Sequence, residues 1–270
     1  NIGVEKEYHP VRKTQLRKGY KTDTMSINSH GLLGPEFKVE PDPRSVRILT
    51  MGDSVTFFPS KRNYSAVLRD NLHEYFPTKD IEVLVGAVPG YDSFRLLHWN
   101  EEFLHKLKPD IAIIYIGWND IGQYSPFGLN YKNAKLTYQN RTIFSTLLEN
   151  SFLLRAPYYF MGRMERAKPV DRSPLTEKEK QLIDNFEPQH YFDNLNNLIQ
   201  QLNEQGTLVY LLNLAAIVTH TPSENEIDKL YFARGMKRKL AIYDGVYNKY
   251  QKALDQVAAA TQTQIIDIQE

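Results

Sequence analysis

The chain has 270 residues, 41% of them hydrophobic, which suits one α/β domain with insertions or two small domains. Its 33 Lys and Arg residues balance 32 Asp and Glu residues, so the net charge of +1 gives no general attraction to nucleic acid or to an anionic membrane. The absence of cysteine excludes disulfides, a thiolate nucleophile and Cys-ligated metal sites.

The N-terminal part of the sequence predicts an extended arm over residues 1–45. Four prolines interrupt it, and we expect it to wrap around the core. Its basic residues favour an arm that is exposed to solvent. The alternative is that this arm lies next to a membrane. No apolar run reaches about 18 residues, so the sequence predicts neither a signal peptide nor a membrane span. A start at Asn1 rather than Met favours a fragment or a processed form.

From residue 46 onward, apolar runs alternate with segments of helical spacing, which predicts one domain over residues 46–270. The predicted strands cover residues 46–51, 81–85, 111–116, 207–212 and 264–268. The predicted helices cover residues 63–76, 93–107, 191–203 and 239–260. This alternation indicates a flavodoxin-like, three-layer α/β/α fold around a parallel sheet of about five strands.

Residues 121–188 interrupt the alternation and are rich in Tyr and Phe. They read as an insertion over the sheet, with a helix expected near residues 143–155. The aromatic residues are expected to pack in a core, although aromatic side chains also stack on sugars.

Three loops follow predicted strands and carry polar residues suited to acyl transfer. They are Gly52-Asp53-Ser54, the loop that contains Gly90, and Gly117-Trp118-Asn119-Asp120. Ligands of a parallel sheet bind beyond the carboxyl ends of its strands, so these loops should share one edge. There Ser54 would expose its hydroxyl, while the Gly90 N–H and the Asn119 amide are uncharged donors suited to an oxyanion.

These blocks, in this order, resemble those of the SGNH/GDSL hydrolase superfamily, and residues 28–36 are similar to a segment upstream of the first block in some bacterial members. The resemblance covers residues 28–268. It implies that Ser54 is the nucleophile, that Gly90 and Asn119 complete the oxyanion hole, and that the chain is a serine esterase working through an acyl-enzyme without metal or organic cofactor. The alternative interpretation is that the glycines only form turns and that Asp53, Ser54 and Asn119 only cap helices.

The catalytic base departs from the family pattern, which takes it from an Asp-x-x-His motif after the last strand. The only such spacing here joins Asp70 to His73, at the far end of a helix, which puts His73 roughly 15–20 Å from Ser54. We therefore expect His73 to be unrelated to catalysis. Of the remaining histidines, only His30 and His220 lie where the sequence allows them to reach the active edge of the sheet. We expect the Asp-x-x-His motif itself within about 40 residues after Glu270.

Two other functions stay open at this level. A polysaccharide O-acetyltransferase would pass the same acyl group to a sugar hydroxyl, and a non-catalytic module could bind glycan on the same fold. The expected partner is a small-molecule, glycan or lipid ester, without nucleic acid and without a transmembrane segment in this chain. The resemblance to exported members favours an extracytoplasmic or membrane-associated place in a bacterium.

Overall fold

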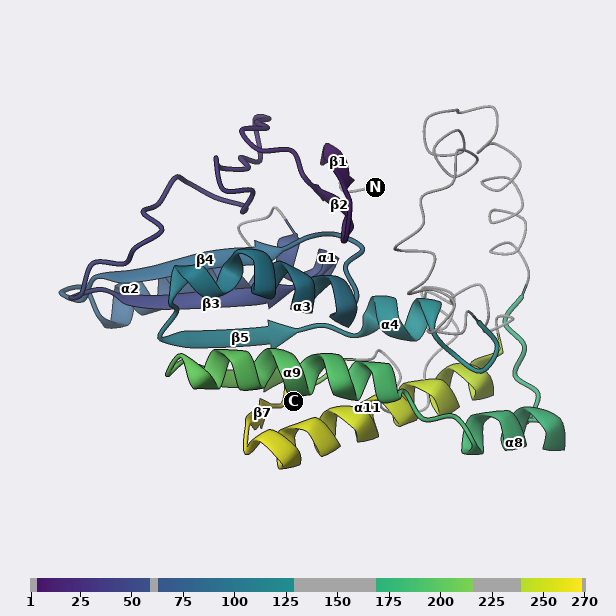
Figure 1. Ribbon diagram of the computed structural model, residues 1–270. Coiled ribbons are helices and arrows are strands. Elements are labelled where there is room, and N and C mark those ends of the chain that lie inside the picture. Colours follow the sequence, from purple (N-terminus) through teal and green to yellow (C-terminus); the bar gives the residue numbers. More distant parts are fainter. Residues whose placement is uncertain (1–3, 59–62, 129–168, 216–238, 269–270) are drawn as a thin grey trace. The chain divides into compact units, whose positions relative to one another are not determined.

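The structure is a computed structural model that describes residues 4–58, 63–128, 169–215 and 239–268 (Figure 1). The helix predicted over residues 143–155, most aromatic residues of the predicted insertion and His220 lie outside these ranges.

A parallel five-stranded sheet forms the core, in the order β4-β3-β5-β6-β7. The strands are β3 (Val46–Gly52), β4 (Ile81–Ala87), β5 (Ile111–Tyr115), β6 (Leu208–Leu212) and β7 (Gln264–Ile266). The first strand of the sheet lies between the second and the third, which is the flavodoxin-like order. The predicted fold is therefore confirmed, and the five predicted strands all form.

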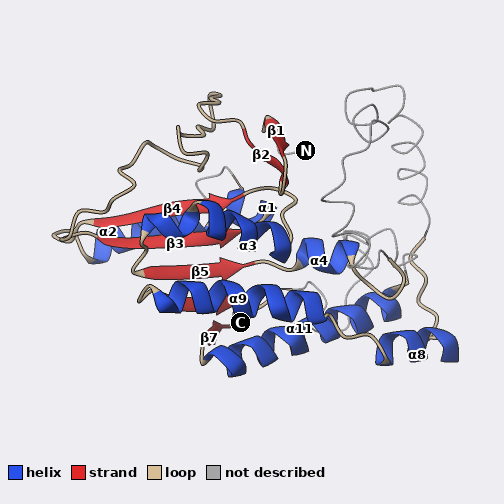
Figure 2. Cartoon of the chain, in the orientation of Figure 1, coloured by secondary structure: helices blue, strands red, loops and turns tan. Residues whose placement is uncertain are grey.

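Helices cover the sheet because each carries an apolar stripe with helical spacing. In α9 (Gln189–Glu204) the stripe consists of Leu195, Leu198, Ile199 and Leu202, all fully buried. This helix lies beside α3 (Ser93–Glu102) on one face of the sheet, and α2 (Tyr64–Tyr75) lies on the other (Figure 2). The predicted helix over residues 93–107 is divided: α3 ends at Glu102, and a 3₁₀ turn, η1 (Leu104–Leu107), follows it.

The N-terminal arm contains a hairpin that the sequence did not predict. Strands β1 (Lys6–His9) and β2 (Lys13–Leu16) pair antiparallel, from Lys6 opposite Leu16 to His9 opposite Lys13. The side chain of His9 closes the connection, because its Nδ1 atom accepts the backbone N–H of Arg12 at 3.0 Å. The strands escaped prediction because their polar residues lack the apolar alternation of a half-buried strand.

The chain divides into two compact units. The first contains the sheet and the hairpin and consists of Asn1–Asn119, Gln189–Ala215 and Ala253–Glu270. The second consists of Asp120–Pro188 and Ala216–Lys252. Helices α4 (Trp118–Gln123) and α11 (Leu240–Thr261) each contribute residues to both units.

Within the second unit, α8 (Glu177–Asp184) begins with a capping box formed by Thr176 and Glu179. Glu179 also pairs with Lys239 at 2.7 Å. The hydrogen bond from Lys239, the backbone N–H of Thr176 and the positive charge of Lys239 together lower the pKa of Glu179 to about 2. None of the described helices is both long and apolar enough to cross a membrane.

Candidate active site

The turn after β3 presents Ser54 at the first position of the short helix α1 (Ser54–Phe57). Gly52 makes the turn feasible, because a Cβ atom there would overlap the backbone carbonyl of Tyr115 and the hydroxyl of Thr56. A larger residue would force β3 and β5 apart at the point where the chain turns. The sequence Gly52-Asp53-Ser54 therefore brings a serine to the carboxyl edge of the sheet.

Asp53 has a buried carboxylate that stabilises this turn through hydrogen bonds. Its Oδ1 atom accepts the backbone N–H of Val55 at 2.9 Å and so caps α1. Its Oδ2 atom accepts the side-chain amide of Asn119 at 3.0 Å. Burial raises the pKa of Asp53 to about 6, against the opposing effect of these hydrogen bonds. Asp53 has no exposed surface, so it acts on the site through the groups that it binds, the Val55 N–H and the Asn119 amide.

Asn119 joins the three predicted loops. Its Nδ2 atom donates to Asp53 in the first loop and, at 2.8 Å, to the backbone carbonyl of Tyr91 in the second. Asn119 itself follows β5, after Gly117, whose φ of 143° lies in the region that favours glycine. Both hydrogens of the amide are thus engaged. Asp53 does cap a helix, as the alternative interpretation expects, but it also binds Asn119, and the Asn119 side chain links loops.

Gly90 lies in a tight turn beside this network. The backbone N–H of Tyr91 donates to Val88 at 3.1 Å, and the N–H of Val88 donates to the carbonyl of Gly52 at 3.2 Å. Gly90 has a φ of 88°, which a side chain would strain. Its own N–H has no hydrogen-bond acceptor among the described residues. Within the described part of the chain, this N–H is thus a donor that is left for a ligand, beside the loop that holds Ser54.

Ser54 opens onto a cavity of about 880 Å³ along the α2 face of the sheet. The lining is largely apolar and includes Val67 and Leu68 of α2, Ile113 and Tyr115 of β5, and Leu212 of β6. Ser54 is half-buried, and its hydroxyl makes no hydrogen bond to a described side chain. A carbonyl group entering this cavity can reach Oγ.

The described histidines are engaged away from Ser54. His73 lies 3.1 Å from the carbonyl of Ile81, at the start of β4 and so at the opposite end of the sheet. His30 packs against Phe37 and Phe103. The others contact α3 or lie in a helix: His9 pairs with Glu102, His98 with Glu101, His105 with the carbonyl of Asn100, and His190 is buried in α9, which lowers its pKa to about 4.

Within the described ranges, no group of three His, Asp or Glu side chains has the arrangement that holds a metal ion. The chemistry that these residues offer is a hydroxyl nucleophile beside neutral hydrogen-bond donors.

Several solved structures are similar to the chain at low identity. TesA has a TM-score of 0.42 at 16% identity, over 81% of this chain and 76% of TesA. A catalytic mutant of Axe2, an acetylxylan esterase from Geobacillus stearothermophilus, has a TM-score of 0.46 at 16% identity, over 82% and 75% of the two chains. LAE5, an alpha/beta hydrolase enzyme from the metagenome of Lake Arreo, Spain, has a TM-score of 0.47 at 16% identity, over 83% and 77%.

By sequence, no curated protein matches the chain. A family model does: that of the GDSL-like Lipase/Acylhydrolase family matches residues 50–270, which include the three loops, the end of β3 and the other four strands of the sheet. The chain therefore belongs to the GDSL-like lipase/acylhydrolase family of serine ester hydrolases.

Proposed function

We propose that Ser54 hydrolyses esters through a covalent acyl-enzyme. Oγ bonds to the ester carbonyl carbon and its proton passes by way of a base to the departing alcohol, whose C–O bond breaks. Water then attacks the acyl carbon and releases the carboxylic acid and free Ser54. The observation that carries the proposal is the double hydrogen bond of Asn119, which ties the Ser54 turn and the Gly90 turn into one site.

The oxyanion of each tetrahedral intermediate is stabilised by the N–H of Gly90, the N–H of Ser54 and the amide of Asn119. Neutral donors fixed in advance stabilise a developing negative charge without being reorganised. Asn119 uses both amide hydrogens within the protein, so one must pass from its present acceptor to the oxyanion. The carbonyl of Tyr91 is the acceptor that it can leave, because the carboxylate of Asp53 holds the other hydrogen more strongly.

The general base is a histidine that the described residues do not bring to Ser54. Serine needs such a base within hydrogen-bond reach, about 2.6–3.2 Å. We propose that it comes from an Asp-x-x-His after the last strand, as the family pattern implies, with His220 as the alternative. The substrate is a small-molecule, glycan or lipid ester, whose scissile carbonyl enters the cavity beside Ser54.

A fluorophosphonate probe tests the proposal in the full-length protein. We expect mass spectrometry to find the phosphonyl adduct on the peptide that contains Ser54, and we expect Ser54→Ala to lose both the adduct and the hydrolysis of p-nitrophenyl acetate. Ser45→Ala is the matched control, because the Ser45 hydroxyl only caps a surface turn at Asp42. Labelling elsewhere, or full activity in Ser54→Ala, would rule the proposal out.

A further inference from the structure

The N-terminal hairpin, β1 and β2, contacts the turn that carries the candidate oxyanion donor Gly90. The hairpin precedes residue 50, where the family match begins. Its side chains nevertheless reach two residues of this turn: Lys6 bonds to Pro89, and Arg12 bonds to Tyr91. These contacts lie within one compact unit of the chain.

Lys6 fixes the peptide plane on the N-terminal side of Gly90. Its Nζ atom lies 2.5 Å from the carbonyl oxygen of Pro89. The peptide bond from Pro89 to Gly90 is trans and planar, so its C=O and N–H point in opposite directions. A carbonyl held by Lys6 therefore directs the Gly90 N–H away from the hairpin. The ammonium also polarises this peptide, which strengthens its N–H as a donor.

A second cation fixes the plane on the C-terminal side of Gly90. The guanidinium of Arg95, in α3, donates through Nη1 to the Gly90 carbonyl. The two cations lie close enough to repel each other: the pKa of Lys6 is lowered first by desolvation and then by Arg95. With both flanking peptide planes held, the direction of the Gly90 N–H is determined from each side.

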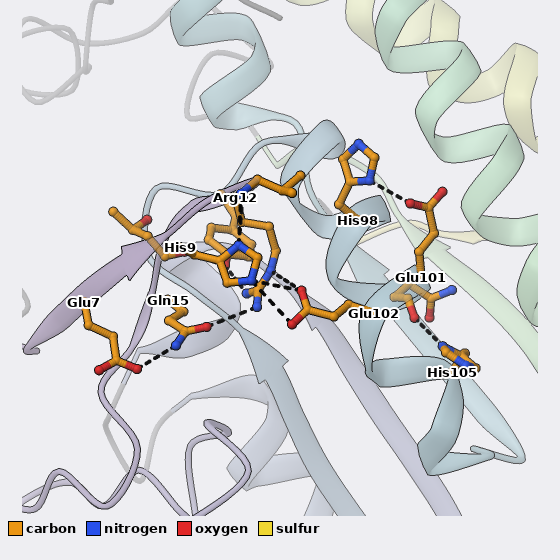
Figure 3. A network of polar contacts seen from close by, with 12 residues as sticks. Glu7, His9, Arg12, Gln15, His98, Glu101, Glu102 and His105 are labelled. Atoms are coloured by element: carbon orange, nitrogen blue, oxygen red, sulfur yellow. Dashed lines mark hydrogen bonds and ion pairs between the residues drawn. The ribbon is translucent and has the colours of Figure 1, made fainter. Parts of the chain in front are cut away.

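Arg12 anchors the next residue of the turn from inside the protein. Its side chain is only 3% exposed and donates through Nη1 to the phenol oxygen of Tyr91 at 2.6 Å. The Tyr91 hydroxyl in turn donates to the carbonyl of Thr14 in β2 at 2.7 Å. Figure 3 shows the guanidinium of Arg12 facing the carboxylate of Glu102 in α3, an ion pair of 3.2 Å. The Gln15 side chain accepts a further hydrogen bond from Arg12 (Figure 3).

The hydrogen bonds from Lys6 and Arg12 matter most to the Gly90 turn when the oxyanion forms. In the proposed mechanism, Asn119 leaves the Tyr91 carbonyl to bind the oxyanion, so the turn loses one of its hydrogen bonds at that moment. The bonds from Lys6 and Arg12 remain in place. We propose that Lys6 and Arg12 are positioning residues of the ester-hydrolysing site, which keep the Gly90 N–H aimed at the oxyanion. This inference rests on the proposed function of Ser54.

The direct test compares Lys6→Met with Arg17→Met in the full-length protein. Each change removes one positive charge from the N-terminal region, but Arg17 is exposed, and its ion-pair partner among the described residues is Glu5. We expect Lys6→Met to lower kcat about tenfold with KM unchanged, because the misaligned donor acts only on the transition state. Phosphonylation of Ser54 should slow by the same factor. Lys6→Arg, which can still donate to the Pro89 carbonyl, should restore most of the rate, and Arg17→Met should behave as the unaltered protein.

Tyr91→Phe tests the hydrogen bond from Arg12 to Tyr91 without removing the buried Arg12 side chain. It removes the hydroxyl between Arg12 and Thr14 while leaving Arg12 its bonds to Glu102 and Gln15. We expect a fall in kcat at constant KM and faster hydrogen exchange of the residue 91 amide, which closes the turn onto Val88.

The outcomes separate this inference from the proposed function. If Ser54→Ala is inactive but Lys6→Met and Tyr91→Phe keep kcat within about twofold, the role of the hairpin is overturned and the esterase proposal stands. Equal losses in Lys6→Met and Arg17→Met would also overturn it, because they would reflect charge alone. Full activity in Ser54→Ala would instead reject the proposed function itself.

Discussion

The amide nitrogen of Asn119 lies 3.0 Å from the buried carboxylate of Asp53, across the carboxyl edge of the sheet. The carboxylate is both the cap of α1 and the fixed point that orients the amide. Because the two residues follow different strands, their contact depends on the parallel register of β3 and β5, in which Gly52 lies opposite Tyr115. The candidate site is thus built by the sheet rather than by any single loop.

Replacement of Asn119 by alanine separates its two roles. We expect Asn119→Ala to reduce kcat by about 10²–10³, the typical effect of losing one oxyanion donor, with a smaller change in KM. Steady-state kinetics with p-nitrophenyl acetate measure both constants, and the thermal midpoint shows whether the fold is kept. A loss below about threefold would mean that Asn119 only joins the loops.

The titration of Asp53 predicts a specific dependence of stability on pH. Its pKa is about 6 in the folded protein against an ordinary value of 3.8, so the folded state binds the proton more tightly. Its contribution to the free energy of unfolding is therefore largest below the unfolded pKa and declines as the pH rises through 6.

Asp53→Asn isolates this contribution, because all other groups are shared. We expect the stability of the unaltered protein relative to Asp53→Asn to fall by about 2 kcal/mol between pH 4.5 and 7.5. Urea unfolding at the two pH values measures the difference. A difference that rises with pH would show that the Asp53 carboxylate is stabilised in the fold. Independently, we expect Asp53→Asn to lose activity, since its amide would face the amide of Asn119.

The sheet and its loops could be predicted because their signals are local. Two of the apolar runs end at a glycine that the turn requires, Gly52 and Gly117, and parallel strands bring such loops to one edge. The end of α3 was less visible: the predicted helix continued to residue 107, but Phe103 leaves the helical region with a φ of −144°.

The part of the site that could not be predicted depends on long-range contacts. Arg12 is one of several basic residues in a polar segment, and nothing near it in the sequence marks it as buried. It is buried because Glu102 and Tyr91, about 80 to 90 residues away, supply a carboxylate and a phenol. Lys6 is similar, since its partner is a backbone carbonyl. Residue type and spacing carry no signal for such pairs.

A methyl group at Gly52 should damage the turn that presents Ser54. We expect Gly52→Ala to destabilise the protein by about 1–3 kcal/mol and to abolish labelling of Ser54, because the Cβ atom overlaps the backbone of Tyr115 in the neighbouring strand. Gly86→Ala is the matched control in β4, where the methyl meets the flexible end of Leu49 at 3.1 Å. Equal losses of stability would contradict the requirement for glycine at Gly52.

Arg47 is the buried charge on which the base of the sheet depends. Its guanidinium has no exposed surface and donates to the carboxylate of Glu82 at 2.7 Å. It also donates to the backbone carbonyls of Lys38, Val39 and Leu107 at 2.7–2.8 Å. A single side chain thus joins the N-terminal arm, β4 and the segment before β5 to strand β3.

We expect Arg47→Met to lower the free energy of unfolding by about 3–5 kcal/mol, because it keeps the apolar stem but leaves Glu82 and the carbonyls without their donor. Arg47→Lys should lose an intermediate amount of stability, because the lysine ammonium has three N–H donors where the guanidinium has five. Arg44→Met is the control: Arg44 is 89% exposed and, among the residues that the structure describes, pairs with Asp42. Its loss should change stability by less than about 0.5 kcal/mol. Urea denaturation of the three variants measures the difference, and equal effects of Arg47→Met and Arg44→Met would show that the buried network adds nothing to stability.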